Sequence, residues 1–385
     1  MSTKYKVSAI LLLLAAELFS ACGIIPYTLP PSIPPPPPHF EFLYATGFRQ
    51  ILEMKLDPST GALSAATATP GPNTALSTTA TMAADPAGKF LFVYDTENEA
   101  IDVFSIDPVT SALTEVGGSP FSAAGIGAPG GLAMDNSGRF LHVAGVFGID
   151  VFVINAKGAL TLVPGSPFLD NNGPLGVLTA PSTKFIYAAD IGQGQAATIS
   201  GFSVNSTTGA LTAVPGSPFS TLVNGSAFYL AAHPSGKFLY AGIPSTRSIE
   251  AWKIDSVMGT LTMLPGFPLA LSSGNNASLS SIVADPSGKF LYVSDDFGDI
   301  FGFTVNASNG ALTAMPGSPF FAFFITDQLF VDPTGRFLYS PAGPFISGFS
   351  IDATTGVPTP LSGSPFPAGA GLAIPATLAF TKGSS

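Results

Sequence analysis

Seven copies of a phrase about 50 residues long predict an all-β chain folded as a seven-bladed β-propeller. One copy begins with Asp-Pro-Ser-Gly-Lys-Phe-Leu-Tyr-Val at Asp285 and ends with Gly-Ala-Leu-Thr at Gly310. The Gly-Ala-Leu-Thr part or a variant recurs at steps of 46 to 51 residues, starting at Gly61, Ser111, Gly158, Gly209, Gly259, Gly310 and Gly356. Self-similarity at this period is typical of propellers and other repeat arrays.

Each copy divides into four short runs rich in β-branched and aromatic residues, with turn residues between them. In the copy that contains Gly310, strands are expected over 279–284, 290–294, 300–305 and 311–315. The first turn is Asp-Pro-Ser-Gly or a variant, which suits a type I turn, and the last runs from Asp or Asn to Gly. No window has a sustained helical period. Four antiparallel strands per unit match one propeller blade.

The C-terminal strand is expected to close the ring. The first copy begins directly at residues 41–44 with no strand before it, whereas residues 376–381 form an extra strand at the end of the chain. Pairing this strand with the three from the N-terminal end would complete the first blade. Closure of this kind leaves no open sheet edge.

The first residues resemble an export signal. Lys4 and Lys6 precede an apolar run over 7–16, as in a secretory signal peptide, which is predicted over residues 1–21. A transmembrane helix needs about 20 apolar residues, so this run is too short to span a bilayer.

The signal ends in Leu-Phe-Ser-Ala-Cys, which resembles the lipobox of bacterial lipoproteins and predicts lipid attachment at Cys22. Phe19 departs from that pattern, which usually has Leu, and ordinary cleavage after Ala21 is the alternative. Residues 22–39 form a Pro-rich linker with five consecutive prolines at 34–38, an extended spacer. The chain is thus expected to be exported and held on a membrane of the bacterial cell envelope.

Composition limits the partners of the mature chain. Only 10% of residues are charged, and after removal of the signal 12 basic and 23 acidic residues remain, a net charge of −11. Nucleic acid is therefore excluded as a partner, and the membrane is contacted only through the lipid anchor. With one cysteine there is no disulfide or cysteine metal site. We expect a monomer without cofactor or metal that binds a small molecule or an envelope protein.

The turns of the predicted blade fall on two faces. The first–second and third–fourth turns share a face on which the copies agree, which we call the constant face. The second–third turns and the links between blades share the other, variable face, where binding residues are usual. The candidate ligand-binding residues on that face are Arg49, Arg247, Asp95, Glu97, Glu99, Asp190, Asp295, Asp296 and Asp299.

These candidates allow more than one interpretation. The two arginines are the only ones outside the repeat phrase and could clamp a carboxylate or phosphate, although a solvated or locally paired arginine is the simpler explanation. The acids could coordinate a hard cation such as Ca²⁺, but they match no calcium-loop spacing, and solvated loop charge is favoured. His39, His142 and His233 lie in the linker or in repeat-phrase positions. No catalytic residue is assigned.

The Phe-Leu-Tyr-Val and Gly-Ala-Leu-Thr phrases, the period and the sevenfold count resemble the seven-bladed lactonase propellers. These include the 6-phosphogluconolactonase and carboxymuconate cyclase type and the YVTN-repeat surface proteins, and the resemblance covers residues 40–383. It implies a lactone hydrolase with His, Arg and Glu around a central channel. The corresponding segments 175–180 and 242–247 contain no His.

Two functions therefore stay open. The favoured one is a propeller that binds a ligand or protein partner on its variable face without catalysis. The alternative is a lactonase-type hydrolase acting on a sugar-acid or related lactone at the central channel.

Overall fold

A compact unit over residues 39–384 is separate from residues 1–38 in the computed structural model. The structure describes 41–47, 50–70, 80–96, 98–123, 129–145, 147–170, 172–181, 184–190, 197–222, 229–272, 277–322, 328–369 and 377–382. The predicted signal peptide, Cys22, the Pro-rich linker and His39 lie outside these residues. In the described part of the chain, no helix is long and apolar enough to cross a membrane.

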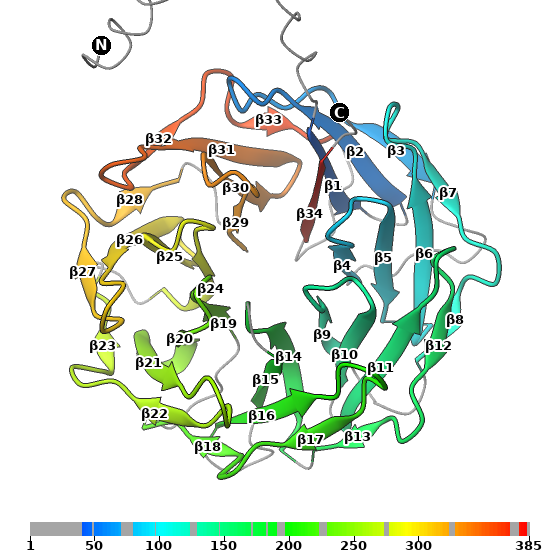
Figure 1. Cartoon of the computed structure of the whole chain (residues 1–385). Helices are drawn as coiled ribbons and strands as arrows, with labels where there is room; N and C mark the ends of the chain where they lie inside the picture. The colour runs from blue at the N-terminus through cyan, green and yellow to red at the C-terminus, as the bar shows by residue number, and fades with distance from the viewer. Residues whose placement is uncertain are drawn as a thin grey trace, which may run out of the picture. The chain divides into compact units, whose positions relative to one another are not determined.

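Seven antiparallel sheets form the unit and are numbered here as blades 1 to 7 (Figure 1). Blade 1 holds β1 (Glu41–Gly47), β2 (Gln50–Leu56), β3 (Thr67–Pro70) and β34 (Leu378–Lys382); blade 2 holds β4 (Ala80–Ala84), β5 (Phe90–Asp95), β6 (Ala100–Ile106), β7 (Leu113–Glu115) and β8 (Phe121–Ser122); blade 3 holds β9 (Pro129–Met134), β10 (Phe140–Gly145), β11 (Gly148–Ile154), β12 (Leu160–Leu162) and β13 (Phe168–Leu169). Blade 4 holds β14 (Pro174–Thr179), β15 (Phe185–Asp190), β16 (Thr198–Val204), β17 (Leu211–Ala213) and β18 (Phe219–Ser220); blade 5 holds β19 (Tyr229–Ala232), β20 (Phe238–Ile243), β21 (Ser248–Ile254), β22 (Leu261–Met263) and β23 (Leu269–Ala270), with a short 3₁₀ helix, η2 (Pro244–Thr246). Blade 6 holds β24 (Leu279–Ala284), β25 (Phe290–Asp295), β26 (Asp299–Val305), β27 (Leu312–Ala314) and β28 (Phe320–Phe321); blade 7 holds β29 (Phe330–Val331), β30 (Phe337–Ala342), β31 (Phe345–Ile351), β32 (Pro358–Pro360) and β33 (Phe366–Pro367).

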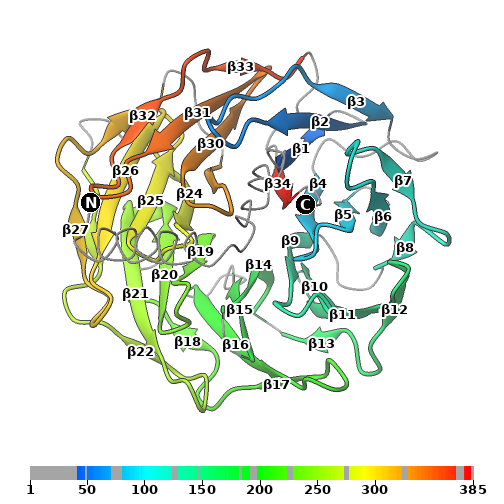
Figure 2. The same cartoon turned by 45° about the horizontal axis from the view of Figure 1, so that its top comes forward.

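The predicted seven-bladed propeller and its closure are confirmed. Strand β34 pairs with β1 in register from Glu41 opposite Lys382 to Ala45 opposite Leu378, so the last strand completes the first blade. In blades 2 to 7 the first strand lies innermost and the later strands follow outward, whereas in blade 1 the innermost strand is β34 (Figures 1 and 2).

The four-strand blade was an incomplete prediction, because six blades carry a fifth, two-residue strand. In blade 6, β27 leaves the ladder after Ala314, and the Ser318 hydroxyl then accepts the backbone N–H of Gly302 at 3.0 Å. The following β28 pairs again with the start of β26. The Gly-Ser-Pro-Phe phrase that ends most copies is thus the outer edge of the blade, interrupted by a serine side chain. Two-residue strands are too short to show a period of two.

Hydrogen bonds between the described turns and the sheets explain the repeated turn phrase. In blade 6, the N–H of Gly288 donates to the carbonyl of Asp285 at 2.9 Å, which closes the predicted type I turn. The Asp285 carboxylate also accepts the N–H of Phe290 at 2.7 Å. This aspartate therefore fixes both the turn and the first residue of the next strand.

Five tyrosine hydroxyls join neighbouring blades. Each donates from the third residue of the Phe-Leu-Tyr phrase to a backbone carbonyl at the Gly-Ala-Leu-Thr position of the next blade. The pairs are Tyr44 with Ser111 (3.0 Å), Tyr187 with Gly259 (2.7 Å), Tyr240 with Gly310 (2.9 Å), Tyr292 with Gly356 (2.6 Å) and Tyr339 with Gly61 (2.6 Å). We call each such contact a tyrosine bridge.

Four of the five bridges sit beside a contact that only glycine allows. A Cβ atom on Gly61 would lie 2.5 Å from the ring of Phe337, the first residue of the same Phe-Leu-Tyr phrase that donates the bridge. A Cβ on Gly259 would meet Phe185 at the same distance. Gly61 also has φ of +74°, a conformation that favours glycine. The two repeated phrases are therefore complementary halves of one contact between blades.

Two seams between blades lack the bridge. The tyrosine position is Phe92 in blade 2 and His142 in blade 3, and both side chains are fully buried. The other described histidine, His233, lies at a different seam and joins blades 5 and 6, because its Nε2 lies 2.8 Å from the carbonyl of Gly288. Both described histidines are thus part of the packing between or within blades.

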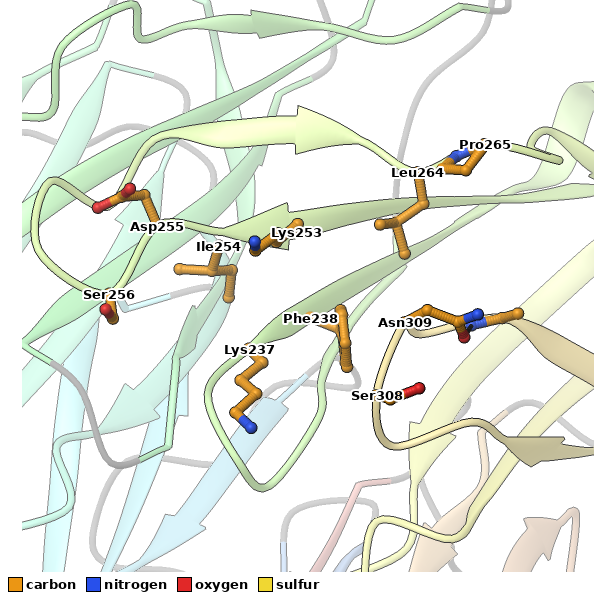
Figure 3. A pocket seen from close by; sticks show the side chains of 11 residues that line it. Lys237, Phe238, Lys253, Ile254, Asp255, Ser256, Leu264, Pro265, Ser308 and Asn309 are labelled. Atoms are coloured by element: carbon orange, nitrogen blue, oxygen red, sulfur yellow. Dashed lines mark hydrogen bonds between the residues drawn. The ribbon is translucent and has the colours of Figure 1, made fainter.

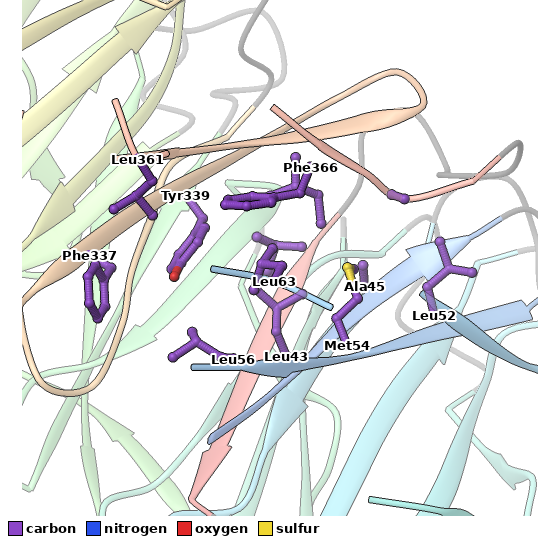
Figure 4. Packing of buried hydrophobic residues seen from close by; sticks show 13 residues of the cluster. Leu43, Ala45, Leu52, Met54, Leu56, Leu63, Phe337, Tyr339, Leu361 and Phe366 are labelled. Carbon is purple, nitrogen blue, oxygen red and sulfur yellow. The ribbon is translucent and has the colours of Figure 1, made fainter. Parts of the chain in front are cut away.

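The core lies in the seams. At the closing seam, Leu43 and Met54 of blade 1 pack with Phe337, Tyr339 and Phe366 of blade 7, as Figure 4 shows. Seven buried clusters of this kind bury the apolar faces of the sheets.

We expect Tyr292→Phe to lower the free energy of unfolding by about 1–2 kcal/mol, because the Gly356 carbonyl loses its donor in a buried site. Tyr94→Phe is the matched control, since the buried Tyr94 hydroxyl has no hydrogen-bond partner among the described residues. Urea unfolding of both variants tests this expectation. Equal effects of the two substitutions would contradict the bridge as a stabilising contact.

We also expect truncation before Ala376 to destabilise the whole ring rather than one blade. It removes β34 and exposes the inner edge of β1. Calorimetry should show a lower melting temperature for the entire transition. An unchanged melting temperature would show that closure does not depend on this strand.

Candidate functional site

A central cavity of about 380 Å³ lies where the innermost strands meet. Its wall comes from β4, β9, β14, β19, β24 and β29, together with the residue that precedes β34. The polar side chains of this wall are Thr81, Tyr229, Ser281, Gln328 and Thr377; the rest of the wall is apolar or glycine. Figure 1 shows these strands arranged around the centre of the ring.

Among the described residues of the wall, no side chain carries a charge. Hydroxyl and amide groups can both donate and accept hydrogen bonds, so this lining suits an uncharged polar ligand. The backbone of Leu329 is fixed to blade 6, because its N–H donates to the Ser281 hydroxyl at 3.1 Å.

Glycines bring two innermost strands unusually close. A Cβ atom on Gly130 of β9 would lie 1.7 Å from the carbonyl oxygen of Leu175 on the neighbouring β14, and one on Gly131 would lie 2.8 Å from the nitrogen of Val177. The backbones of blades 3 and 4 are thus in direct contact at the channel wall. Any larger side chain at Gly130 would force the two blades apart.

Three predicted site residues, Asp95, Asp190 and Asp295, occupy one equivalent position. Each ends the second strand of its blade and pairs with the first residue of the innermost strand. Their side chains are at most 1% exposed. The interpretation of these three as solvated loop charge is therefore wrong. The strand extends one residue further than the phrase suggests, so the carboxylates are enclosed in the seams rather than held in loops.

Asp190 is the most perturbed of the three. Burial, and then the charge of Asp170 from blade 3, raise the pKa of its carboxyl to about 7. One carboxylate oxygen accepts the hydroxyls of Thr198 at 2.7 Å and Ser200 at 2.8 Å. The other oxygen, Oδ1, has no hydrogen-bond partner in the described part of the chain. A carboxyl group with this pKa can exchange a proton near neutral pH, as general acid–base catalysis requires.

Arg247 is brought together with Asp295. The arginine follows η2 in a left-handed conformation with φ of +49°, and its Nη2 lies 3.4 Å from Oδ2 of Asp295 in the next blade. Asp295 also accepts the N–H groups of Phe297 at 3.1 Å and Asp299 at 3.0 Å. Burial raises the pKa of Asp295, and the charge of Arg247 opposes that rise. The arginine is thus locally paired across the seam between blades 5 and 6.

Of the remaining predicted site residues, Asp296 and Asp299 lie near Asp295, with Asp299 at the start of β26, and Glu99 lies in blade 2. Asp296 is exposed and accepts the N–H of Ser278 at 2.8 Å, and Glu99 has φ of +47° at the turn before β6. Arg49 and Glu97 lie outside the described residues. Within the described ranges, no group of three acidic or histidine side chains could hold a metal ion.

Several buried acids were missed from the sequence, and three of them share one position. Asp102, Asp150 and Glu250 take the third position of the third strand in blades 2, 3 and 5, where blades 4 and 7 have serine. Burial raises the pKa of Asp102 to about 7, with Asp95 adding to it, and that of Asp150 to about 6. The signal was visible as an acid inside the apolar phrase Ile-Asp-Val-Phe, which occurs in both blades 2 and 3.

His142 is buried and remains neutral. Burial lowers its pKa to about 4, although Asp135 and the backbone of Ala133 oppose the shift. Its position inside blade 3 excludes a role at the channel mouth.

These pKa shifts predict that the protein is more stable at pH 5 than at pH 8. The folded-state pKa values of Asp102, Asp150 and Asp190 are raised, so their folded forms keep protons that the unfolded chain has lost, and stability falls as pH rises to about 7. The lowered pKa of His142 acts oppositely, removing stability as pH falls from about 6.5 towards 4, but it is one group against three. Melting temperatures across this range test the prediction, and Asp102→Asn should flatten the fall. A higher melting temperature at pH 8 would contradict it.

Comparison with solved structures supports the fold. A periplasmic gluconolactonase of Pseudomonas aeruginosa matches with a TM-score of 0.72 and 16% identity, covering 90% of this chain and 100% of that one. A putative 6-phosphogluconolactonase from Bacteroides uniformis matches with a TM-score of 0.69 and 20% identity over 89% and 100% of the two chains. One from Bacteroides fragilis matches with 0.69 and 18% over 92% and 99%. No curated protein matches the sequence significantly.

A family model described as "Lactonase, 7-bladed beta-propeller" matches residues 49–374, which is most of the chain and includes every blade. Together with the seven closed blades, this match shows that the chain belongs to the seven-bladed β-propeller lactonase family.

Proposed function

We propose that this protein is an exported lactone hydrolase that acts on an uncharged sugar-acid lactone in the central channel. The observation that carries the proposal is the 380 Å³ cavity with neutral hydrogen-bonding groups and apolar surface in its described wall. A sugar lactone presents hydroxyls and C–H faces to such a wall.

The charge of the channel distinguishes between two lactone substrates. A phosphorylated lactone would need a cationic partner, and the described wall has none. The similar periplasmic gluconolactonase of Pseudomonas aeruginosa and the predicted signal peptide both favour a substrate found outside the cytoplasm. The proposed substrate is therefore an unphosphorylated aldonolactone.

The reaction needs water, a base and a group that stabilises negative charge on oxygen. Water adds through its oxygen to the lactone carbonyl carbon, the bond from that carbon to the ring oxygen breaks, and a proton passes to the ring oxygen to leave a hydroxy acid. Asp190 is the proposed base, because its pKa is about 7 and, although its carboxyl is buried behind the cavity wall, it pairs with Pro174, the first residue of β14, whose Gly176 and Val177 line the channel. The Gln328 amide and Tyr229 hydroxyl are the proposed donors to the carbonyl oxygen.

The membrane anchor is part of the same proposal. A lipid on Cys22 and the Pro-rich linker would hold the propeller at the cell envelope. Cys22→Ser should move the protein from the membrane fraction to the soluble fraction.

We expect the purified protein to hydrolyse glucono-δ-lactone with a kcat/KM at least about tenfold above that for its 6-phosphate. The acid released is measured by pH-stat titration, and the rate of spontaneous lactone hydrolysis is subtracted. Asp190→Asn should lower kcat by about 10²–10⁴-fold, and Gln328→Leu should lower kcat by about 10²–10³-fold. Asp352→Asn is the matched control, because it lies in a constant-face turn where blades 4 and 6 already have asparagine.

Equal turnover of both lactones would contradict the neutral-channel proposal. Ligand binding in calorimetry without any turnover would instead support the second candidate, a propeller that binds a ligand or protein partner on its variable face. That candidate rests on the absence of His from the described channel wall. Arg247→Ala tests whether this arginine also contacts the ligand. This variant also removes the arginine that pairs with Asp295, so its stability has to be measured as well. A loss of binding that the change in stability does not explain would support that role.

A further inference from the structure

A groove of about 610 Å³ opens between blades 5 and 6 on the constant face, away from the variable-face residues discussed above. One side carries Lys237, Phe238 and Lys253, and the facing turn of blade 6 carries Ser308 and Asn309, as Figure 3 shows. Neither the family relationship nor the proposed lactone reaction involves this groove.

Two equivalent seams are bridged by arginine. Arg139 of blade 3 donates from Nη1 to the carbonyl of Ser206 in blade 4 at 2.8 Å, and its guanidinium lies 5.0 Å from the ring of Phe140. Arg336 of blade 7 makes the same contacts, with the carbonyl of Pro58 at 2.7 Å and the ring of Phe337 at 5.1 Å. The guanidinium thus spans the space between one blade and the turn of the next.

Lys237 takes the arginine position in blade 5 but does not bridge the seam. Within the described ranges it makes no side-chain hydrogen bond to the turn that contains Ser308 and Asn309. The seam therefore keeps an open groove with an ammonium group on one wall. A ligand there would occupy the space that a guanidinium spans at the other two seams.

A second lysine distinguishes this seam from the others. Lys253 is paired across the strands with Phe238, the residue after Lys237, and both lysines line the groove. No other blade has a basic residue at both positions, where the second residue is Ser105, Val153, Ser203, Thr304 or Ser350 in blades 2, 3, 4, 6 and 7. In a chain of net charge −10, two lysines in one groove form a local basic site.

The single acid of the groove is held by its own turn. One oxygen of Asp255 accepts the N–H groups of Val257 at 2.9 Å and Met258 at 2.8 Å, and these bonds, with a smaller contribution from Lys253, lower the pKa of its carboxyl. Two ammonium groups against one carboxylate leave a net positive charge in the groove. The remaining lining is hydroxyl, amide and apolar, including Leu264 and Pro265.

We propose that this groove binds a carboxylate-bearing saccharide, attracted by the positive charges of Lys237 and Lys253. A charge-assisted hydrogen bond from an ammonium group would hold the carboxylate, and the second lysine would add to the attraction. The Asn309 amide and Ser256 hydroxyl would meet sugar hydroxyls, and Leu264 and Pro265 would meet the C–H face of the ring. The groove is far larger than a carboxylate alone requires, which favours a sugar of one or two units over a simple anion.

The test is calorimetric titration of the purified protein with D-glucuronate and digalacturonate, beside glucose and inorganic phosphate. Lys237→Met and Lys253→Met should each weaken binding of the acidic sugars about tenfold. Lys289→Met is the matched control, because Lys289 holds the same position in blade 6, where the next residue, Phe290, pairs with the neutral Thr304; this variant should leave binding unchanged.

A gain-of-binding variant complements these losses. Asp255→Asn keeps the turn, since Asn205 and Asn306 cap the same turn in blades 4 and 6, and it removes the only negative charge of the groove. It should tighten binding about two- to fivefold. Binding that is unaffected by both lysine variants, or equal for glucose, would overturn the proposal. Inorganic phosphate binding as tightly as D-glucuronate would show that the site takes simple anions, and no binding of either sugar acid would also reject it.

Discussion

The contact on which the ring depends is the tyrosine bridge between neighbouring blades. A hydroxyl on one blade reaches the carbonyl of a glycine, or of Ser111, on the next, while the aromatic ring two residues earlier packs where that glycine has no side chain. Both repeated phrases of the sequence contribute residues to this contact. A propeller blade has no neighbour except the two beside it, so its stability depends on such nearest-neighbour terms. The bridge from Tyr339 to Gly61 makes the same contact at the seam between blades 7 and 1, where the ring closes.

The seams without the bridge hold several perturbed side chains. Phe92 and His142 replace tyrosine at the seams from blade 2 to blade 3 and from blade 3 to blade 4. The buried acids Asp150 and Asp190 belong to blades 3 and 4, and the glycine contact between β9 and β14 lies at the second of these seams. Burial holds the Tyr94 hydroxyl protonated at a raised pKa, and the charges of Glu99 and Asp150 add to that effect. Perturbed side chains also occur at a seam with the bridge, since Asp295 pairs with Arg247 between blades 5 and 6.

The architecture was predictable because all seven blades use the same strand and turn phrases, which recur in the sequence at a period of 46–51 residues. The closing strand was predictable for the same reason, since residues 376–381 had the pattern of the one strand that the first blade lacked. The fifth strands were not, because two residues carry no period and the Ser318 hydroxyl replaces a backbone acceptor. The burial of Asp95, Asp190 and Asp295 was hidden as well, because a carboxylate at a strand end looks like the start of a loop until its neighbouring blade is placed. Asp102 and Asp150 could have been recognised in the sequence, because each is an acid inside an otherwise apolar strand.

The pairing of β34 with β1 has a consequence for how the chain comes to be folded. A polypeptide is made from its N-terminus, so the inner edge of β1 stays unpaired until the residues of β34 have been made. Every other blade is complete once its own segment has emerged. The ring can therefore close only after the segment that contains β34 has left the ribosome. Until then, the open edge of β1 is the point at which the unfinished protein is most exposed to pairing with another strand.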